Sequence, residues 1–298
     1  MANTIEYAKV FQSELDKQIT EGATSGWMED NASRVIYNGG SEIKMPKMSL
    51  KGLAKYDRDD GYVSGAITYS YETMTMSQDR GRRFRIDALD VDESGFALAA
   101  ANVAAEFQRT EVIPEIDAYR YSKLGAAASI TKTYTPAKSS VLSTLIGQIS
   151  AVREAVGGDG ELVVTMARSV YDMLMLSSEV THSLDAGSFS QGDLELNVKT
   201  ICGASVIPVP SSRMMSAYTF SDTDGFAAND DAVQINWIIC PKDAPVAVSK
   251  TDNIKIITPE QNQFADAWDI DYRKYHDLFI PDSKKAAIAV CKAAQATA

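Results

Sequence analysis

The spacing of apolar positions between residues 94 and 125 predicts the longest helix of the chain. Its apolar side chains recur at helical spacing, at Phe96, Ala100, Val103, Phe107, Ile113, Ile116 and Leu124. Two acids and a capping hydroxyl at positions 92–94 suit the start of a helix, and Gly125 suits a left-handed end. Because Pro114 removes one backbone hydrogen bond, we expect a kink or a break near Thr110.

The chain before this helix is predicted to form an arm and then a β-ribbon. Residues 1–37 combine an amphipathic helix with a polar strip, so this arm must lie on its own body or on a neighbouring subunit. Residues 38–90 alternate as strands do but carry too few large apolar groups for a core. An isolated hairpin is marginally stable, so we expect the ribbon to pack on another copy. The apolar positions that mark these segments are Phe11 and Leu15 in the arm and Tyr69 and Tyr71 in the ribbon.

An α/β pattern follows the long helix, and a β pattern follows that. Within residues 126–242 we predict helices at 139–156, ended by Gly157, and at 169–177, and strands at 161–166, 194–198, 205–209 and 233–240. Within residues 243–298 we predict strands at 246–249, 255–258, 268–279 and 285–291. These last strands need an apolar cover, and the helix in residues 91–125 is the natural candidate. The fold class is therefore α+β, with the lobe 126–242 inserted between that helix and its sheet.

Composition limits the class of protein. The chain has 298 residues, 45% hydrophobic and 23% charged, as ordinary soluble proteins do. Its net charge of −11 argues against a protein that wraps nucleic acid with its whole surface, since phosphate binding needs clustered cations. No run of 18 apolar residues and no apolar signal core occurs, so we expect neither a membrane span nor secretion. The three cysteines lack paired spacing and are expected to be buried free thiols.

Few residues form a pattern that could carry catalysis. His182 and His276 have no second ligand at metal-binding spacing, and residues 222–225 resemble a calcium loop whose glycine comes too early. We therefore expect neither a metal nor a cofactor. Asp269 and Asp271 lie two apart on a predicted strand and hence on one face, where they could share a proton. A soluble α+β hydrolase that uses these two carboxylates is the alternative from a different class.

A basic cluster is unusual in so acidic a chain. It comprises Arg80, Arg82, Arg83 and Arg85, around a predicted turn at residues 79–83. Guanidinium groups form bidentate pairs with carboxylates, so we interpret the cluster as an intersubunit contact. Its acidic partners on a sister subunit could be the loop 222–231 or the pair at 29–30. A solvated turn and a DNA contact are the alternatives.

The order of arm, ribbon, long helix, inserted lobe and closing sheet resembles the major capsid protein of tailed bacteriophages, which has the Hong Kong 97-like capsid fold. The stretches that carry the resemblance are RVIYNGGSEIKMPKMSLKGLAKYDRDDGY, RRFRIDALDVDESG, VKTICGASVIPVPSSRM and DIDYRKYHDLFIPDSKKAAIAV. The resemblance implies that residues 38–90 are the extended loop and that residues 91–125 and 243–298 form the peripheral domain. Residues 126–242 would then be the axial domain, which surrounds the centre of each hexamer or pentamer.

The resemblance also implies a function and partners. It implies a structural protein, not an enzyme, that self-assembles through pentamers and hexamers into an icosahedral shell enclosing double-stranded DNA without sequence-specific binding. The shell would assemble in the host bacterial cytoplasm and become the virion capsid, with a portal and, where required, separate scaffolding or decoration proteins. An encapsulin-type nanocompartment shell is the alternative with the same fold. No pattern singles out a lysine of the ribbon for covalent linkage, so no cross-link is predicted.

Overall fold

The computed structural model describes residues 22–37, 41–56, 58–59, 61–89, 104–177, 200–222 and 225–294. Its strands are β1 (Ile36–Tyr37), β2 (Glu42–Leu50), β3 (Ile67–Thr75), β4 (Gln78–Asp87), β5 (Ile130–Thr133), β6 (Leu162–Ala167), β7 (Thr200–Ile201), β8 (Ala204–Val209), β9 (Tyr218–Ser221), β10 (Gly225–Ala228), β11 (Ile235–Pro241), β12 (Val246–Ile257), β13 (Ala267–Phe279) and β14 (Ala289–Lys292). Its α-helices are α4 (Ile113–Ala127), α5 (Val141–Val156), α6 (Arg168–Met175) and α8 (Asp282–Lys285). The 3-10 helices are η1 (Gly26–Arg34) and η4 (Ser211–Arg213), and η3 (Gln108–Val112) is a π-helix.

The larger lobe is built on a six-stranded mixed sheet of order β5-β14-β11-β6-β8-β7. Strands β6 and β11 are buried at every position, as expected for strands covered on both faces. Trp237 of β11 donates a hydrogen bond to Gln148 of α5, whereas the next residue, Ile238, faces Gly125 of α4. Because neighbouring residues of a strand point to opposite faces, α5 and α4 cover opposite faces of this sheet. The predicted helix 139–156 is confirmed as α5, and Gly157 ends it in the left-handed conformation, with φ of 76°.

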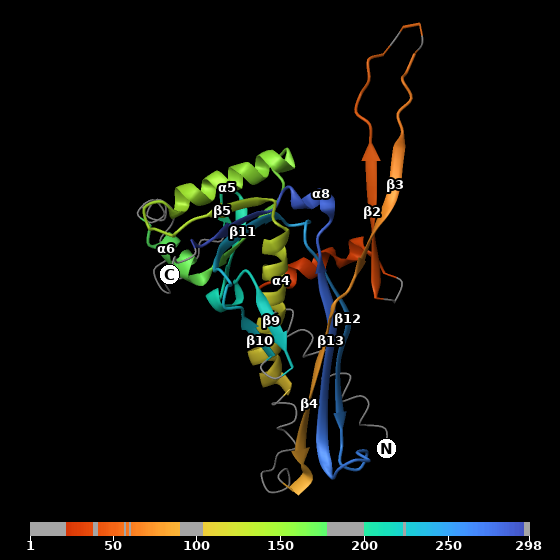
Figure 1. The fold of residues 1–298 in the computed structure, drawn as a ribbon, viewed down its shortest axis with the longest axis vertical. Coiled ribbons are helices and arrows are strands. Elements are labelled where there is room, and N and C mark those ends of the chain that lie inside the picture. Colours follow the sequence, from red (N-terminus) through yellow and green to blue (C-terminus); the bar gives the residue numbers. More distant parts are fainter. Residues whose placement is uncertain are drawn as a thin grey trace, which may run out of the picture.

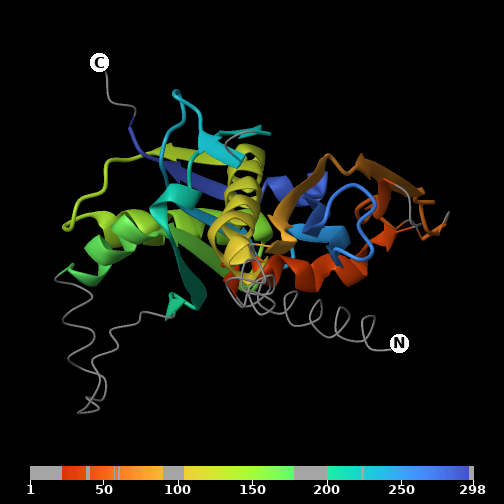
Figure 2. The same cartoon turned by 90° about the horizontal axis from the view of Figure 1, so that it is seen from below.

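The second sheet is antiparallel, with the order β12-β13-β4. Its inner face presents Ile254, Ile270 and Tyr272 to Val112 and Ile116 of the long helix. Figures 1 and 2 show α4 between this sheet and the larger lobe. The prediction that the long helix covers the C-terminal strands is therefore confirmed. The strands predicted at 246–249 and 255–258 are one strand, β12, with an irregularity between Ser249 and Thr251.

Two expectations about these strands are wrong. Residues 79–83 are not a turn but part of β4, which pairs with β13 from Asp87↔Ala267 to Gln78↔His276. The strand predicted at 285–291 does not join the second sheet, because β14 lies between β5 and β11 in the larger one. The first three positions of β14 are buried, which suits the interior of a sheet covered on both faces.

The long helix is irregular near Thr110, as Pro114 predicted, but it does not break there and it does not end at Gly125. Residues 104–107 are helical, and η3 then inserts one π-turn immediately before α4. Pro114 explains it, because its ring would crowd the carbonyl of Thr110 four residues earlier, and the wider turn relieves that contact without breaking the helix. Gly125 does not end the helix, which continues to Ala127. The predicted helix 4–20, residues 94–103 and the predicted strand 194–198 lie outside the described residues.

Gly125 is needed for close packing instead. A Cβ atom at this position would lie 2.9 Å from Cδ1 of Ile235 on β11. We predict that Gly125→Val lowers the free energy of unfolding by about 1–3 kcal/mol, as overpacking of a core does. Gly147→Ala on α5 is the matched control, because open space surrounds Gly147; it should raise stability by roughly 0.5–1 kcal/mol. Urea denaturation of the unassembled subunit measures both, and equal effects would contradict this role of Gly125.

Candidate assembly surface

A hairpin of β2 and β3 projects from the body (Figure 1). The two strands pair without interruption from Glu42↔Thr75 to Leu50↔Ile67. At the base of the hairpin, Ile43, Met45 and Met76 are buried against residues of β12 and β13. The base therefore belongs to the folded body, and only the part beyond Met45 projects.

Beyond the base, the outer face of the hairpin is apolar and exposed. Its side chains form an apolar stripe, with exposed fractions of 61% for Met48, 64% for Leu50, 71% for Ile67, 56% for Tyr69 and 49% for Tyr71. Cross-strand register pairs Met48 with Tyr69 and Leu50 with Ile67, so all five lie on one face. The opposite face at this level carries Lys47, Ser49, Thr68 and Ser70. Exposed apolar patches of this kind mark interaction sites.

Large exposed side chains continue past the stripe toward the tip of the hairpin. Leu53 and Tyr62 are almost wholly exposed, and Val63 is largely exposed. The rings of Tyr56 and Tyr62 meet edge to face, with their centroids 4.9 Å apart. The exposure of Tyr69 and Tyr71 agrees with the one-sided ribbon expected from the sequence. Their contact with another subunit stays a prediction.

The buried carboxylate of Asp277 fixes the base of this hairpin. It accepts hydrogen bonds from the backbone N–H and the hydroxyl of Ser77, at 2.9 and 3.0 Å, and from the hydroxyl of Tyr119 at 2.6 Å. The N–H of Leu278 and the ammonium group of Lys123 also donate to it. Ser77 connects β3 to β4, whereas Tyr119 and Lys123 belong to α4. One side chain of β13 therefore joins the hairpin to the long helix.

These contacts shift the pKa values of the two side chains on α4. Burial raises the pKa of Tyr119, and its hydrogen bond to Asp277 raises it further. Burial acts to lower the pKa of Lys123, but its hydrogen bonds to Asp277 and Tyr119 outweigh this and leave the pKa raised. Lys123 therefore stays charged beside Asp277 over the whole physiological range of pH.

A second buried carboxylate, Asp117 of α4, joins two other segments to this helix. It accepts hydrogen bonds from the N–H and hydroxyl groups of Thr24 and Ser25 and from the guanidinium of Arg213, at 2.6–3.2 Å. The buried Arg120 pairs with Glu29 close by. The sequence predicts that the arm lies either on its own body or on a neighbouring subunit. Residues 24–34 lie on their own body. Phe11 and Leu15 lie outside the described residues.

The four arginines predicted to contact a sister subunit have partners in their own chain. Arg80 forms an ion pair with Glu115 and donates to the carbonyl oxygens of Ser221 and Gly225, at 3.1 and 3.0 Å, while Arg82 donates to that of Asp222 at 2.6 Å. The loop that we expected to receive them on a sister subunit is thus contacted within the chain, through its backbone. Arg83 and Arg85 form bidentate pairs with Asp271 and Asp269 across β4 and β13. A role between copies stays a prediction.

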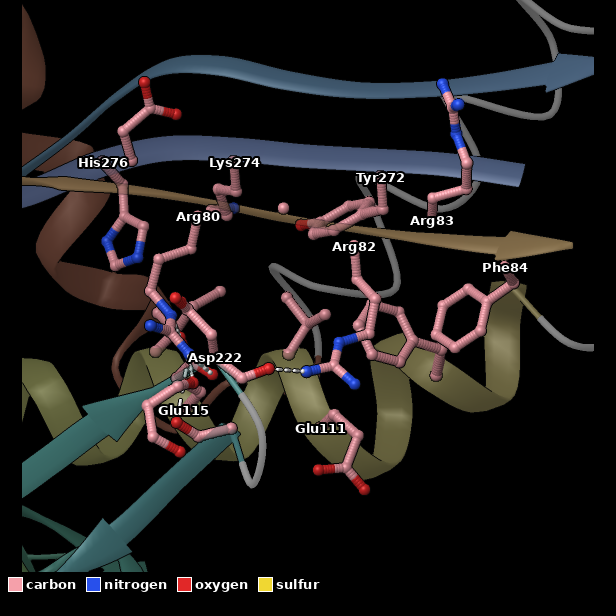
Figure 3. Close-up of a pocket in the computed structure, with 17 residues that line it drawn as sticks. Arg80, Arg82, Arg83, Phe84, Glu111, Glu115, Asp222, Tyr272, Lys274 and His276 are labelled. Atoms are coloured by element: carbon pink, nitrogen blue, oxygen red, sulfur yellow. Dashed lines mark hydrogen bonds and ion pairs between the residues drawn. The ribbon is translucent and has the colours of Figure 1, made fainter. Parts of the chain in front are cut away.

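Figure 3 shows the pocket of about 850 Å³ into which the first two arginines reach. Strands β4 and β13 form one wall, and the long helix and the β9–β10 turn form the others. His276 lies in this wall, and burial lowers its pKa well below the usual value, so it is neutral. Within the described residues, no group of three or more His, Cys, Asp or Glu side chains could hold a metal ion. His182 lies outside these residues.

The pair Asp269 and Asp271 is not arranged as a catalytic acid and base. Its hydrogen bonds to Arg85 lower the pKa of Asp269, whose side chain is 2% exposed beneath that guanidinium. A general acid at neutral pH needs the opposite shift. Both carboxylates instead hold β4 on β13.

Sequence reasoning missed the two carboxylates that matter most to this geometry. Asp277 stands in the run His276–Ile280, where every other residue but the histidine is apolar, and Asp117 lies within the long helix. An acid inside an otherwise buried stretch is the signal that could have identified both, because buried charges need several donors.

No family model and no curated protein matches the sequence. The fold matches the asymmetric unit of the bacteriophage PhiM1 mature capsid with a TM-score of 0.60 and 14% identity, over 87% of this chain and 83% of that one. It matches the capsid of cyanophage P-SCSP1u with a TM-score of 0.56 and 12% identity, over 88% of this chain and 86% of that one. It also matches a virus-like particle from Pyrococcus furiosus with a TM-score of 0.52 and 12% identity, over 96% of this chain and 99% of that one.

The chain has the fold of proteins that build shells. More narrowly, its structural neighbours include phage capsids, so the predicted likeness to a major capsid protein is confirmed at the level of the fold. Such neighbours are structural proteins. Among the helices that the structure describes, none is long and apolar enough to cross a membrane.

We predict that Asp277→Asn destabilises the subunit by roughly 3–5 kcal/mol, because the amide turns an NH2 donor toward some of the buried donors and removes the negative charge that balances Lys123. Asp172→Asn on α6 is the matched control, since Asp172 is exposed and pairs with Arg168 one turn away; it should cost less than about 0.5 kcal/mol. Thermal unfolding of the unassembled subunits compares the two, and similar losses would refute the role given to Asp277.

A second prediction concerns pH. The pKa of Asp269 is lower in the folded chain than the unfolded value of about 3.9. This ion pair therefore adds stability above that pH, and the contribution is lost as the pH falls through the folded pKa. The gap between the denaturation midpoints of the unsubstituted subunit and Arg85→Met should be largest near neutral pH and should shrink steadily toward about pH 3. A difference in midpoint that does not change with pH would contradict this. Arg168→Met is the control, and its midpoint should stay close to that of the unsubstituted subunit at every pH.

Proposed function

We propose that this chain is a major capsid protein of the Hong Kong 97-like type. It self-assembles through pentamers and hexamers into an icosahedral shell that encloses double-stranded DNA without sequence-specific binding. The observation that carries the proposal is the apolar stripe on a hairpin that projects from a chain with the fold of phage capsids. In this proposal the lobe 126–242 surrounds the centre of each capsomer. The host bacterial cytoplasm is the place of assembly and the virion capsid the final location.

The stripe supplies the physical reason for assembly. Its five side chains are half to three-quarters exposed, so water contacts an apolar face that none of the described residues covers. Burying a large apolar side chain contributes roughly 1.5–3 kcal/mol, so covering this face on a neighbour gives several kcal/mol for each copy. Such contacts are modest alone and become decisive when each subunit repeats them around a closed shell.

The remaining partners are part of the same proposal. The first part of the arm, with Phe11 and Leu15, lies against neighbouring subunits. Arg80, Arg82, Arg83 and Arg85 contribute to contacts between copies in addition to their pairs within the chain. A portal and, where required, separate scaffolding or decoration proteins complete the particle. The chain's net charge of −11 suits a container that must not bind tightly to its packed DNA.

An encapsulin-type shell is the second candidate. The match to the virus-like particle from Pyrococcus furiosus favours it, because that match covers 96% of this chain and 99% of the other, more than the two phage matches described above. The contents of the particles distinguish the two, since a nanocompartment encloses protein cargo. The hydrolase alternative lacks support, because Asp269 and Asp271 are both ion-paired.

We predict that Met48→Asp with Leu50→Asp abolishes particle formation while the subunit stays folded, because charge on the stripe opposes its burial. The matched control is Lys47→Gln with Ser49→Asp, which changes the charge equally on the other face of the same strand. Size-exclusion chromatography and electron microscopy should find particles for the control and the unsubstituted chain only. Normal particles from the stripe variant would overturn the role of the stripe, and a monomeric unsubstituted chain would overturn the proposed function.

A further inference from the structure

The outer edge of β3 is an unpaired strand edge without the usual protection. The hairpin sheet has the order β1-β2-β3, so β3 pairs on one side only among the described residues. The outer edge of β2 is bordered at its base by β1 and then carries Pro46 and Lys47. Proline and lysine are devices by which natural edges resist pairing with another chain. Strand β3 has neither in its nine residues, and Glu72 is its single charge.

The sequence of β3 is complementary to itself in one antiparallel register. With Ser70 opposite Ser70 of a second copy, Tyr69 lies opposite Tyr71 of that copy, and Thr68 lies opposite its Glu72. Aromatic pairs stabilise directly opposed positions, and no two like charges meet. Centring the pair on Glu72 would oppose two carboxylates, and centring it on Tyr71 would leave Tyr69 opposite threonine.

We propose that β3 pairs with β3 of a second copy in this register, about a twofold axis. The inference rests on the proposed function and names one of the contacts between copies. In this register a residue with an odd number always pairs with a residue with an odd number. Because side chains alternate between the two faces of a strand, the apolar faces of the two hairpins then join into one four-stranded surface. The contact is isologous, with the same strand on both sides, and an icosahedral shell has twofold axes on which such a contact can lie.

A disulfide tests the register. Cys202 is exposed and Cys240 and Cys291 are buried, so the parent chain for this test carries Cys202→Ser. Ser70→Cys places one thiol on each side of the axis. Ser49→Cys is the matched control, since Ser49 is equally an exposed serine of the same hairpin, but on β2 and away from the axis. Assembled particles are treated with diamide, which takes up the two electrons and two protons released by each pair of thiols, and are then separated under denaturing, non-reducing conditions.

We expect on the order of tenfold more linked dimer from Ser70→Cys than from Ser49→Cys, because a disulfide needs Cβ atoms within about 4.5 Å of each other. Equal linkage, or particles in which Ser70→Cys stays unlinked, overturns this inference and leaves the proposed function standing. The second result is also the one expected if a strand of another protein occupies the edge. Failure of the parent chain to form particles overturns the proposed function instead.

A non-covalent test avoids any effect of oxidation. Thr68→Glu faces Glu72 of the second copy in this register, so it should raise the subunit concentration needed for assembly severalfold, and adding Glu72→Lys should restore it. Ser49→Glu on β2 is the control and should leave that concentration unchanged. Equal effects of Thr68→Glu and Ser49→Glu, or no rescue by Glu72→Lys, contradict the pairing.

Discussion

The constraint on which this structure depends is the burial of one carboxylate at the meeting point of three segments. Asp277 belongs to β13, and its donors Tyr119 and Lys123 belong to α4. A third donor, Ser77, connects β3 of the hairpin to β4. A carboxylate removed from water is stable only when donors surround it, so these segments must meet there together. The direction in which the hairpin leaves the body is thereby fixed. Asp117 imposes the same kind of constraint on residues 24–34, α4 and the larger lobe.

That fixed direction explains why the polarity of the hairpin changes along its length. Near the joint, Ile43 and Met45 point to the body and are buried, because β12 and β13 are there to receive them. Farther out no part of the described chain faces the hairpin, and the apolar side chains Met48 and Tyr69 stand on its other face. Within the described part of the chain, this apolar face is therefore held away from the core and has no cover. This geometry, more than any single residue, connects the fold to the assembly that we propose.

Much of the fold could be predicted from local pattern, and the missing parts are long-range. The helix now labelled α5, its end at Gly157 and the alternation of β3 depend on neighbouring residues, so the sequence identifies them. The apolar run in β14 indicates burial but not which sheet buries it. Likewise Arg83 and Arg85 indicate ion pairs, and only the register of β4 on β13 places Asp271 and Asp269 within reach. The part played by Asp277 depends on contacts nearly 200 residues apart in sequence.

The central claim is that the apolar stripe is exposed in the single chain and covered between copies. Hydroxyl-radical footprinting measures this directly, because methionine and tyrosine side chains react when water reaches them. We expect Met48, Tyr69 and Tyr71 to react readily in unassembled subunits and to be strongly protected in particles. Tyr62, near the tip of the hairpin, separately reports how far the covered surface extends. Equal reactivity of the three stripe residues in subunits and particles would contradict the claim.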